Sequence, residues 1–284
     1  MTDERITDTW LIAEHNEYEC LRWIHRAGGL LARQLGRVVW PGSASTKDKG
    51  KRMAEITLAR LKRDRMIIER PLTKGGPLYV LGERGAALLR EHGINHAPAR
   101  GHRDLSIKSP YHTAICNDYA IDCYLAGEEI WTEFEISRGL APLPRVAVSS
   151  RKTKLPDVFT RASGDCSWIE VENTPKSKVR LREIISVAQA LLHKQDEFTV
   201  GPNGKDGVMH DLRILLPNDQ ATRATVNICL AAKDNWSGDS AFATHLIRVE
   251  MSPRLMWNGE HARMSVEELL AALANKDQTN GKTE

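Results

Sequence analysis

A predicted β-hairpin in the N-terminal third of the chain restricts the possible folds more than any other local pattern. Two short runs rich in β-branched and aromatic residues, at 66–72 and 77–82, flank the sequence Thr73-Lys74-Gly75-Gly76. Such residues favour strands, and a short connection that contains glycine is typical of a hairpin. The elements before this hairpin then decide which fold it belongs to.

Three segments with helical periodicity precede the hairpin. The first begins at Glu17 and ends at Gly28-Gly29, and the second, at 30–40, ends at Pro41. The third runs from 51 to 67 and repeats apolar residues at helical spacing: Met53, Ile56, Leu58 or Ala59, Leu61 and Met66. The N-terminal region is therefore predicted to be helix, helix, helix and hairpin.

This element order is that of a winged-helix domain. We predict the domain over residues 1–94, with an amphipathic helix at 82–93 as its last element. The polar segment 95–109 is predicted to be a linker. A winged helix places its third helix in the major groove, so double-stranded DNA with a specific site is the predicted partner.

Basic residues are concentrated on the predicted third helix and its flanks. The formal net charge of the 284-residue chain is only +3. Between Lys47 and Arg70, however, nine Lys or Arg residues stand against four Asp or Glu. The alternative interpretation is a solvated helix face that binds nothing. The predicted DNA contacts on this helix and on the wing are Lys49, Lys51, Arg52, Arg60, Arg63 and Lys74.

Residues 110–270 are predicted to form a second domain, of α+β or α/β class, with a mixed sheet flanked by helices, followed by a polar tail at 271–284. Strand candidates at 155–162 and 166–173 flank Ser163-Gly164-Asp165, which is typical of a hairpin. Helical and strand patterns alternate in the rest of the domain. Further strands are expected at 209–217 and 244–253, and helices at 111–127, 178–195, 221–233 and 265–276.

Three carboxylates are predicted to converge at this second hairpin. Side chains alternate across a strand, so Glu170 and Glu172 share a face, and the hairpin brings Asp157 beside them. Three carboxylates at one place repel one another, and a bound Mg²⁺ or Mn²⁺ removes that cost. Such an ion can activate water and polarise a phosphodiester. The alternative is that the two glutamates form the solvent face of an amphipathic strand.

The order of features around these carboxylates resembles that of a known nuclease fold. The order resembles that of the PD-(D/E)xK nucleases: a helix, an acid-rich segment, a Pro-Asp dipeptide, an acidic doublet and then a helix that begins with basic residues. More narrowly, a winged helix followed by YHTAICNDYAIDCYL, WTEFEIS, LPDVF and WIEVENTPKSKVRLREI resembles the replication-relaxation family of plasmid proteins, which includes MobC-type relaxases. The resemblance covers residues 15–255. It implies metal-dependent DNA nicking in the replication, relaxation or mobilisation of a plasmid or mobile element.

The resemblance also assigns roles to individual residues. It places Glu133 at the first acidic position, Asp157 at the Pro-Asp aspartate and Glu170 at the first acid of the doublet. Glu135 competes with Glu133, because the two share a face if residues 128–137 form a strand, and that segment has features of both strand and helix. His112, near the start of the domain, is a further catalytic candidate. The simpler interpretation is a structural or exposed histidine.

Glu172 departs from the family pattern. A standard member carries a lysine at this position. Either Glu172 acts as general base or metal ligand, or the cation comes from Lys176 or Lys178, or the fold is catalytically inactive and retained for DNA binding. The inactive form predicts a replication initiator or transcriptional regulator. A restriction or phage-defence nuclease is a further alternative, and a homodimer and contacts with mobilisation or replication proteins are compatible with all of these.

A basic segment at 140–154 precedes the Pro-Asp dipeptide and is predicted to be a loop that contacts phosphate. Its candidate contacts are Arg151, Lys152 and Lys154. Motifs of other nucleophile systems, including His-hydrophobic-His, GxSxG and the P-loop, do not occur in the sequence. A covalent tyrosine, such as Tyr18, Tyr111 or Tyr119, is an open alternative, with no local pattern that marks one.

Composition excludes several other classes of protein. The five cysteines are odd in number, scattered and without a CxxC pair, which argues against a disulfide framework or a zinc site and predicts buried thiols. No apolar run approaches eighteen residues, and the N-terminal segment is acidic where a signal peptide is basic. We therefore expect a cytoplasmic protein that binds DNA and does not enter membranes.

Overall fold

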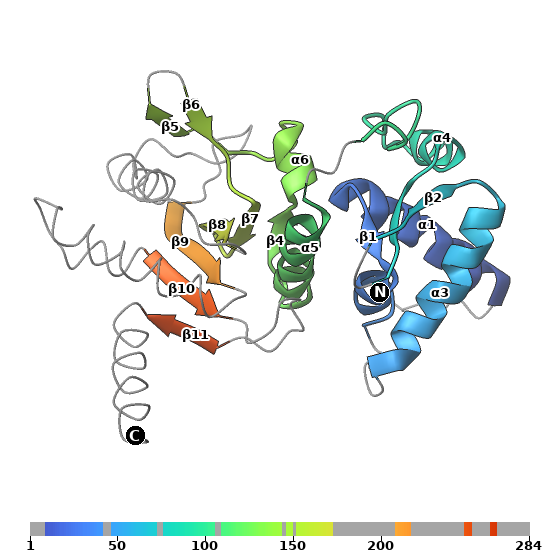
Figure 1. The fold of residues 1–284 in the computed structure, drawn as a ribbon, viewed down its shortest axis with the longest axis horizontal. Helices are drawn as coiled ribbons and strands as arrows, with labels where there is room; N and C mark the ends of the chain where they lie inside the picture. The colour runs from blue at the N-terminus through green and yellow to red at the C-terminus, as the bar shows by residue number, and fades with distance from the viewer. Residues whose placement is uncertain are drawn as a thin grey trace, which may run out of the picture. The chain divides into compact units, whose positions relative to one another are not determined.

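The computed structural model describes residues 9–41, 47–72, 76–105, 109–143, 146–149, 152–172, 208–216, 247–251 and 262–265. Helices and strands are mixed along the chain, which confirms the predicted α+β class (Figure 1). The chain divides into two compact units, Met1–Asn117 and Asp118–Glu284. The two units are described one at a time below.

Unit 1 contains the predicted helices and hairpin. Its helices are α1 (Thr9–Ala27), α2 (Ala32–Val39), α3 (Lys47–Arg63) and α4 (Glu83–Glu91). Its strands β1 (Leu30–Leu31), β2 (Ile67–Arg70) and β3 (Leu78–Leu81) form an antiparallel sheet in the order β1-β3-β2. The first helix begins eight residues earlier than predicted, because its first turns expose apolar side chains and so carry no amphipathic signal: Trp10, Leu11 and Ile12.

The buried face of α3 differs from the predicted one. Met53 and Ile56, predicted to be core residues, are 38% and 47% exposed. The reason is a close approach of α2 and α3, where a Cβ placed on Gly36 would lie only 2.6 Å from the backbone carbon of Gly50. This contact turns the small-residue side of α3 inward and leaves its larger aliphatic residues outside. Of the predicted apolar positions, Leu58 and Leu61 are buried, together with Ala54 and Thr57.

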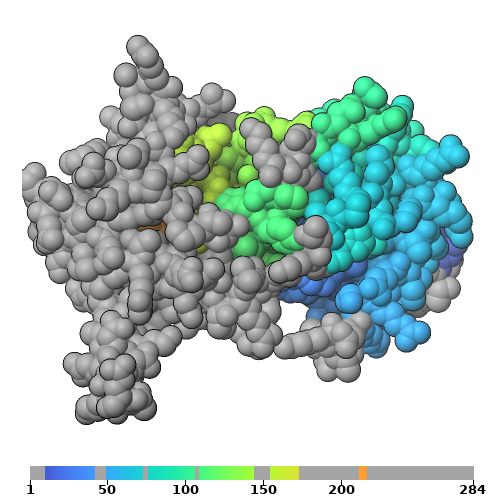
Figure 2. Space-filling view, viewed as in Figure 1, coloured from blue at the N-terminus to red at the C-terminus, as the bar shows by residue number. Residues whose placement is uncertain are grey.

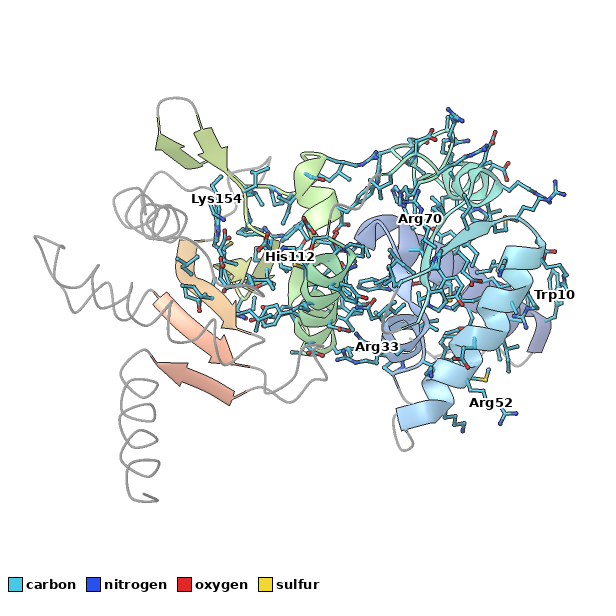
Figure 3. The ribbon with its side chains drawn as sticks, in the orientation of Figure 1. Trp10, Arg33, Arg52, Arg70, His112 and Lys154 are labelled. Atoms are coloured by element: carbon cyan, nitrogen blue, oxygen red, sulfur yellow. The ribbon has the colours of Figure 1, made fainter. Side chains whose placement is uncertain are left out.

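Much of the predicted linker packs onto unit 1. The backbone N–H of His102 donates to the carbonyl of Leu81 at 2.8 Å, and the His102 side chain is buried. The guanidinium of Arg70 donates to backbone carbonyls in the same segment, that of His102 at 3.0 Å among them (Figure 3). Residues 95–105 therefore form part of the folded unit, whereas 106–108 lie outside the described residues.

The first half of α5 (Pro110–Leu125) also belongs to unit 1. The side-chain amide of Gln34 donates to the carbonyl of Ala114 at 2.8 Å, and that of Asn117 donates to the carbonyl of Gly29 at 3.0 Å. Both amides are buried, so these bonds satisfy polar groups that would otherwise be costly to remove from water. The boundary between the two compact units, after Asn117, therefore lies later in the chain than the linker predicted at 95–109.

Unit 2 is built on a six-stranded mixed sheet. Its strands β4 (Glu129–Trp131), β7 (Val158–Ala162), β8 (Asp165–Val171), β9 (Val208–Leu216), β10 (Ile247–Met251) and β11 (Ala262–Ser265) are ordered β11-β10-β9-β8-β7-β4. Neighbouring strands are antiparallel from β4 to β8, parallel from β8 to β10 and antiparallel at β11. The sequence had not indicated β11. A short helix, α6 (Glu133–Ser137), follows β4.

The basic segment at 140–154 is not the loop that was predicted. It contains the strands β5 (Val146–Ser149) and β6 (Lys152–Lys154), which pair as a separate antiparallel ribbon (Figure 1). Valine alternates with small residues at 146–149 and Thr153 stands between two lysines, so the pattern supports short strands even though the segment is rich in proline and serine. Lys154, the last residue of β6, is followed closely by the Pro156-Asp157 dipeptide that precedes β7.

Two further expectations concern the chain as a whole. The four cysteines that the structure describes are buried free thiols, as predicted: Cys20, Cys116, Cys123 and Cys166. Cys229 and the predicted helices after residue 172 lie outside the described residues. Across the described part of the chain, every helix is too short or too polar to cross a membrane.

Candidate functional site

The β7–β8 hairpin holds Asp157 at its open end. β7 and β8 pair from Val158 opposite Ile169, and the backbone N–H of Asp157 donates to the carbonyl of Ile169 at 2.9 Å. The Asp157 carboxylate accepts the backbone N–H of Val171 at 2.8 Å. One side chain therefore closes the hairpin and is held in place beside the acidic doublet.

Glu170 and Glu172 lie on one face of β8 and are buried. Strand alternation places them on the same side as Trp168, with relative exposures of 0% for Glu170 and 1% for Glu172. The backbone N–H of Glu172 extends the parallel ladder by donating to the carbonyl of Leu215 at 2.8 Å. The interpretation of these glutamates as a solvent-facing strand edge is therefore wrong.

A lysine lies against this acidic face. The Nζ of Lys154, at the end of β6, forms an ion pair with Oε2 of Glu170, and the lysine side chain is only 18% exposed (Figure 3). The indole Nε1 of Trp168 donates to the other oxygen of Glu170 at 2.7 Å. From the sequence, Lys154 was predicted to contact phosphate, and Lys176 or Lys178, after the doublet, to supply the missing cation. Both of these later lysines lie outside the described residues.

The four charged groups influence one another electrostatically. Burial raises the pKa of Glu170 to about 7, and Asp157 adds to the rise, whereas Lys154 and Trp168 oppose it. Burial disfavours the charged form of Lys154, but Glu170, Asp157 and Glu172 outweigh burial and raise the pKa of the lysine. Asp157, Glu170, Glu172 and Lys154 thus form one cluster, which we call the acid–lysine cluster.

The donor set of the acid–lysine cluster is suited to a hard divalent cation. Three carboxylates and one ammonium carry a formal charge of −2 when all are ionised, and a divalent ion neutralises that charge. Carboxylate oxygens are the ligands that Mg²⁺ and Mn²⁺ prefer. Glu170 already has Lys154 and Trp168 on its two oxygens, so its use as a ligand requires Lys154 to give up this ion pair.

Glu133 and Glu135 have different positions. Thr132 is the N-cap of α6: its backbone N–H donates to the Glu135 carboxylate at 3.0 Å, and the Glu135 N–H donates to the Thr132 hydroxyl at 3.3 Å. Glu135 is therefore occupied in capping. Glu133 begins the same helix and is not among the groups that shift the pKa of Lys154 or Glu170. The predicted grouping of Glu133 with the other acids has no support in these interactions.

The other catalytic candidates lie elsewhere. His112 occupies the first turn of α5 and is half-buried (Figure 3). The Tyr119 hydroxyl accepts a hydrogen bond from Nη1 of Arg213 at 3.3 Å in a buried site, which is poor placement for a nucleophile. The Tyr18 ring lies 5.1 Å from that of His92.

A second buried charged cluster lies on the opposite face of the sheet. Arg213 on β9 pairs with Asp211 at 3.2 Å and with Glu128 at 3.6 Å, and these charges together with Tyr119 raise its already high pKa against the effect of burial. Ile169 is in register with Arg213, whereas Glu170 is in register with Ile214, so the two clusters lie on different faces. The sequence signal was the pair of charges in the otherwise apolar strand DLRILL, which sequence analysis did not use.

The residues of α3 that were predicted to contact DNA differ in their exposure to solvent. Lys49, Lys51, Arg52 and Arg63 are exposed, and Arg52 points outward from the helix (Figure 3). Arg60 instead donates to Glu17 of α1 at 2.7 Å and is only partly exposed, so it braces two helices. The space-filling view shows the α3 side chains at the surface of unit 1 (Figure 2). The remaining predicted contacts lie outside what the structure describes, wholly or in their side chains: Lys74, Arg151 and Lys152.

Comparison with protein-family models, with curated proteins and with solved structures finds no match to this chain. The function is therefore inferred from the chemistry and geometry of the two units.

Proposed function

We propose that the chain is a DNA-binding protein whose second unit nicks one DNA strand with the help of Mg²⁺ or Mn²⁺. The observation that carries this proposal is the acid–lysine cluster at the open end of the β7–β8 hairpin. Two acids from a hairpin and a nearby lysine are the residue types of the PD-(D/E)xK pattern that the sequence resembles. In this chain the lysine comes from β6, ahead of the Pro-Asp dipeptide, instead of from β8.

The topology of unit 1 supports the DNA-binding part of the proposal. Three helices precede a β-hairpin, and β1 joins that hairpin in the order β1-β3-β2, an arrangement compatible with a winged helix. The exposed lysines and arginines on α3 are suited to contact with phosphate. Met53 and Ile56, which are exposed between them, are suited to contact with thymine methyl groups.

The chemistry of the acid–lysine cluster supports the nicking part. Asp157, Glu170 and Glu172 would hold the divalent ion, which when bound supplies water activation and polarisation of the phosphodiester. Burial raises the pKa of Glu170 to about 7 in the absence of a metal ion, and a divalent ion held by this carboxylate would favour its ionised form. Lys154, once it leaves Glu170, can place its ammonium against the negative charge of the phosphate.

A supercoiled-plasmid assay in Mg²⁺ or Mn²⁺ tests the proposal. We expect the wild type to produce open circles, and Asp157→Asn, Glu170→Gln and Lys154→Met to lower the nicking rate by at least about 100-fold, as expected when groups that act on the transition state are lost. Asp165→Asn is the matched control, because Asp165 lies at the other end of β8. Equal nicking by wild type and variants of confirmed fold would overturn the proposal.

A non-catalytic role is the second candidate, favoured by one observation. The Lys154–Glu170 ion pair satisfies the central carboxylate without any metal, and a glutamate stands at the usual lysine position. A replication initiator or transcriptional regulator with a degenerate nuclease fold predicts salt-sensitive DNA binding and no cleavage. A restriction or phage-defence nuclease predicts linear product, from cutting of both strands.

A further inference from the structure

We propose that a basic cavity in unit 1 is a phosphate site that grips the backbone of the bound DNA. This inference rests on the DNA-binding part of the proposed function and adds contacts that are not among the DNA-binding residues predicted from the sequence. The cavity has a volume of about 520 Å³, and its charged lining is Lys62, Arg65, Arg100 and Arg103 with Glu69 and Glu83. These residues come from the end of α3, from β2, from the start of α4 and from the segment 95–105.

The charges around the cavity leave two arginines available. Lys62 is paired with Glu69, and Arg100 lies 3.1 Å from Asp104. The guanidinium groups of Arg65 and Arg103 are exposed and form no ion pair or hydrogen bond with the described residues. Two arginines from different elements thus face one cavity with their donors unused. Arginine is the side chain best suited to bidentate contact with phosphate.

The backbone at Arg65 adds an independent observation. Arg65, two residues after the end of α3, has the left-handed conformation with φ of 60°, and its N–H donates to the carbonyl of Lys62 at 3.0 Å. Glycine is the residue that favours this position at the end of a helix, since a Cβ is strained there. An arginine in this strained conformation points to a role for the side chain itself.

Close backbone packing holds the elements around the cavity in place. A Cβ on Gly82 would lie 2.8 Å from the carbonyl oxygen of Arg65, and one on Gly101 would lie 2.5 Å from that of Leu81. The carbonyl of Arg103 also accepts a hydrogen bond from Arg70. The attachment points of the two arginines are therefore fixed before any ligand binds, which lowers the entropic cost of binding.

The occupant that fits best is a phosphate of the nucleic acid backbone. Arg63 is exposed and follows Lys62, which lines the cavity. It therefore continues the positive surface along α3. A duplex that contacts the outer face of α3 presents phosphates at regular spacing along such a surface. Free inorganic phosphate shares the same chemistry, and the test below separates the two.

Fluorescence anisotropy with a 20-base-pair duplex at several salt concentrations tests the site. Arg65→Gly and Arg103→Ala are each expected to weaken binding about tenfold and to reduce the slope of log affinity against log salt by about 1. Arg65→Gly should melt no lower than the wild type, because glycine fits the left-handed position. Arg84→Ala is the matched control: Arg84 is exposed in α4 and does not line the cavity.

Each outcome of this experiment has a distinct meaning. Wild-type affinity and slope in both variants would overturn the cavity site and leave the proposed function standing. Absence of DNA binding by the wild type would overturn the DNA-binding part of the proposed function and this inference with it. If calorimetry shows inorganic phosphate binding that both variants lose while DNA binding is unchanged, the ligand is a free phosphate and the DNA-backbone assignment is wrong.

Discussion

At the scale of single residues, Glu170 illustrates how burial and ion pairing compete. Removal from water raises the pKa of this carboxyl, and the ammonium of Lys154 and the indole of Trp168 only partly reverse the rise. The result is a buried carboxyl whose pKa is raised to about 7. Such a group is suited to proton transfer, and it also makes stability depend on pH.

The pH dependence of stability has a definite sign. The pKa of Glu170 is about 7 in the folded protein against an ordinary value of 4.5. Its contribution to stability is therefore complete below pH 4.5 and is lost as the pH rises through 7. We expect the free energy of unfolding of the wild type, relative to Glu170→Gln, to fall by about 3 kcal/mol between pH 5 and pH 8.

Urea denaturation of the two proteins at each pH measures this difference, and Asp165→Asn provides the control. A difference between wild type and Glu170→Gln that stays constant, or grows, from pH 5 to pH 8 would contradict the raised pKa. Taking the difference cancels the titration of groups that both proteins share.

At the scale of elements, α3 shows that one helix can have two aliphatic faces. The face toward α2 is made of small residues around Gly50 and Ala54, because the two helix backbones approach closely. The outer face keeps Met53 and Ile56 among lysines and arginines. Helical periodicity detects that a helix is amphipathic, but these two faces give overlapping signals.

Two aliphatic residues on α3 provide a matched test of this rotation. Leu58 is 1% exposed and Ile56 is 47% exposed. Leu58→Ala should lower the free energy of unfolding by about 3 kcal/mol, whereas Ile56→Ala should lower it by no more than about 0.5 kcal/mol. Chemical denaturation monitored by circular dichroism measures both, and similar losses in the two variants would refute the assigned orientation of α3.

At the scale of the whole molecule, the proposal assigns different tasks to the two units. Unit 1 carries the exposed cations of α3, and unit 2 carries the acid–lysine cluster. Substitutions in the two units should therefore affect different measurements. Effects at well-separated, independent positions are also expected to be additive.

We expect Arg52→Ala to weaken DNA binding and to reduce its salt dependence by about one phosphate contact, with Mn²⁺ binding unchanged. Asp157→Asn should weaken Mn²⁺ binding at least about tenfold and leave DNA affinity in the absence of metal unchanged, because the proposed function makes its carboxylate a metal ligand and not a DNA contact. Anisotropy and calorimetry on the full chain measure the two properties. A variant that lost both properties while remaining folded would contradict the division of tasks.

Local patterns in the sequence were sufficient for α3, α4 and the β2–β3 hairpin of unit 1, for the β7–β8 hairpin and for the shared face of Glu170 and Glu172. These depend on periodicity, turn residues and strand alternation, which act over a few neighbouring residues. Only the tertiary structure decided that Lys154 is the cation of the acidic centre. It lies sixteen residues before Glu170 and reaches it because the ribbon β5–β6 turns the chain back toward the hairpin.

The same distinction explains the other differences. Burial of Glu170 depends on the neighbouring strands β7 and β9, and the inward face of α3 depends on a glycine contact with α2. Likewise, Arg60 pairs with Glu17 across two helices, and the segment 95–105 packs onto unit 1 through Arg70 and Leu81. The sequence by itself determined most of the helices, the two hairpins and the shared face of Glu170 and Glu172. Pairings between distant residues required the fold, because burial and charge contact arise only when distant segments are brought together.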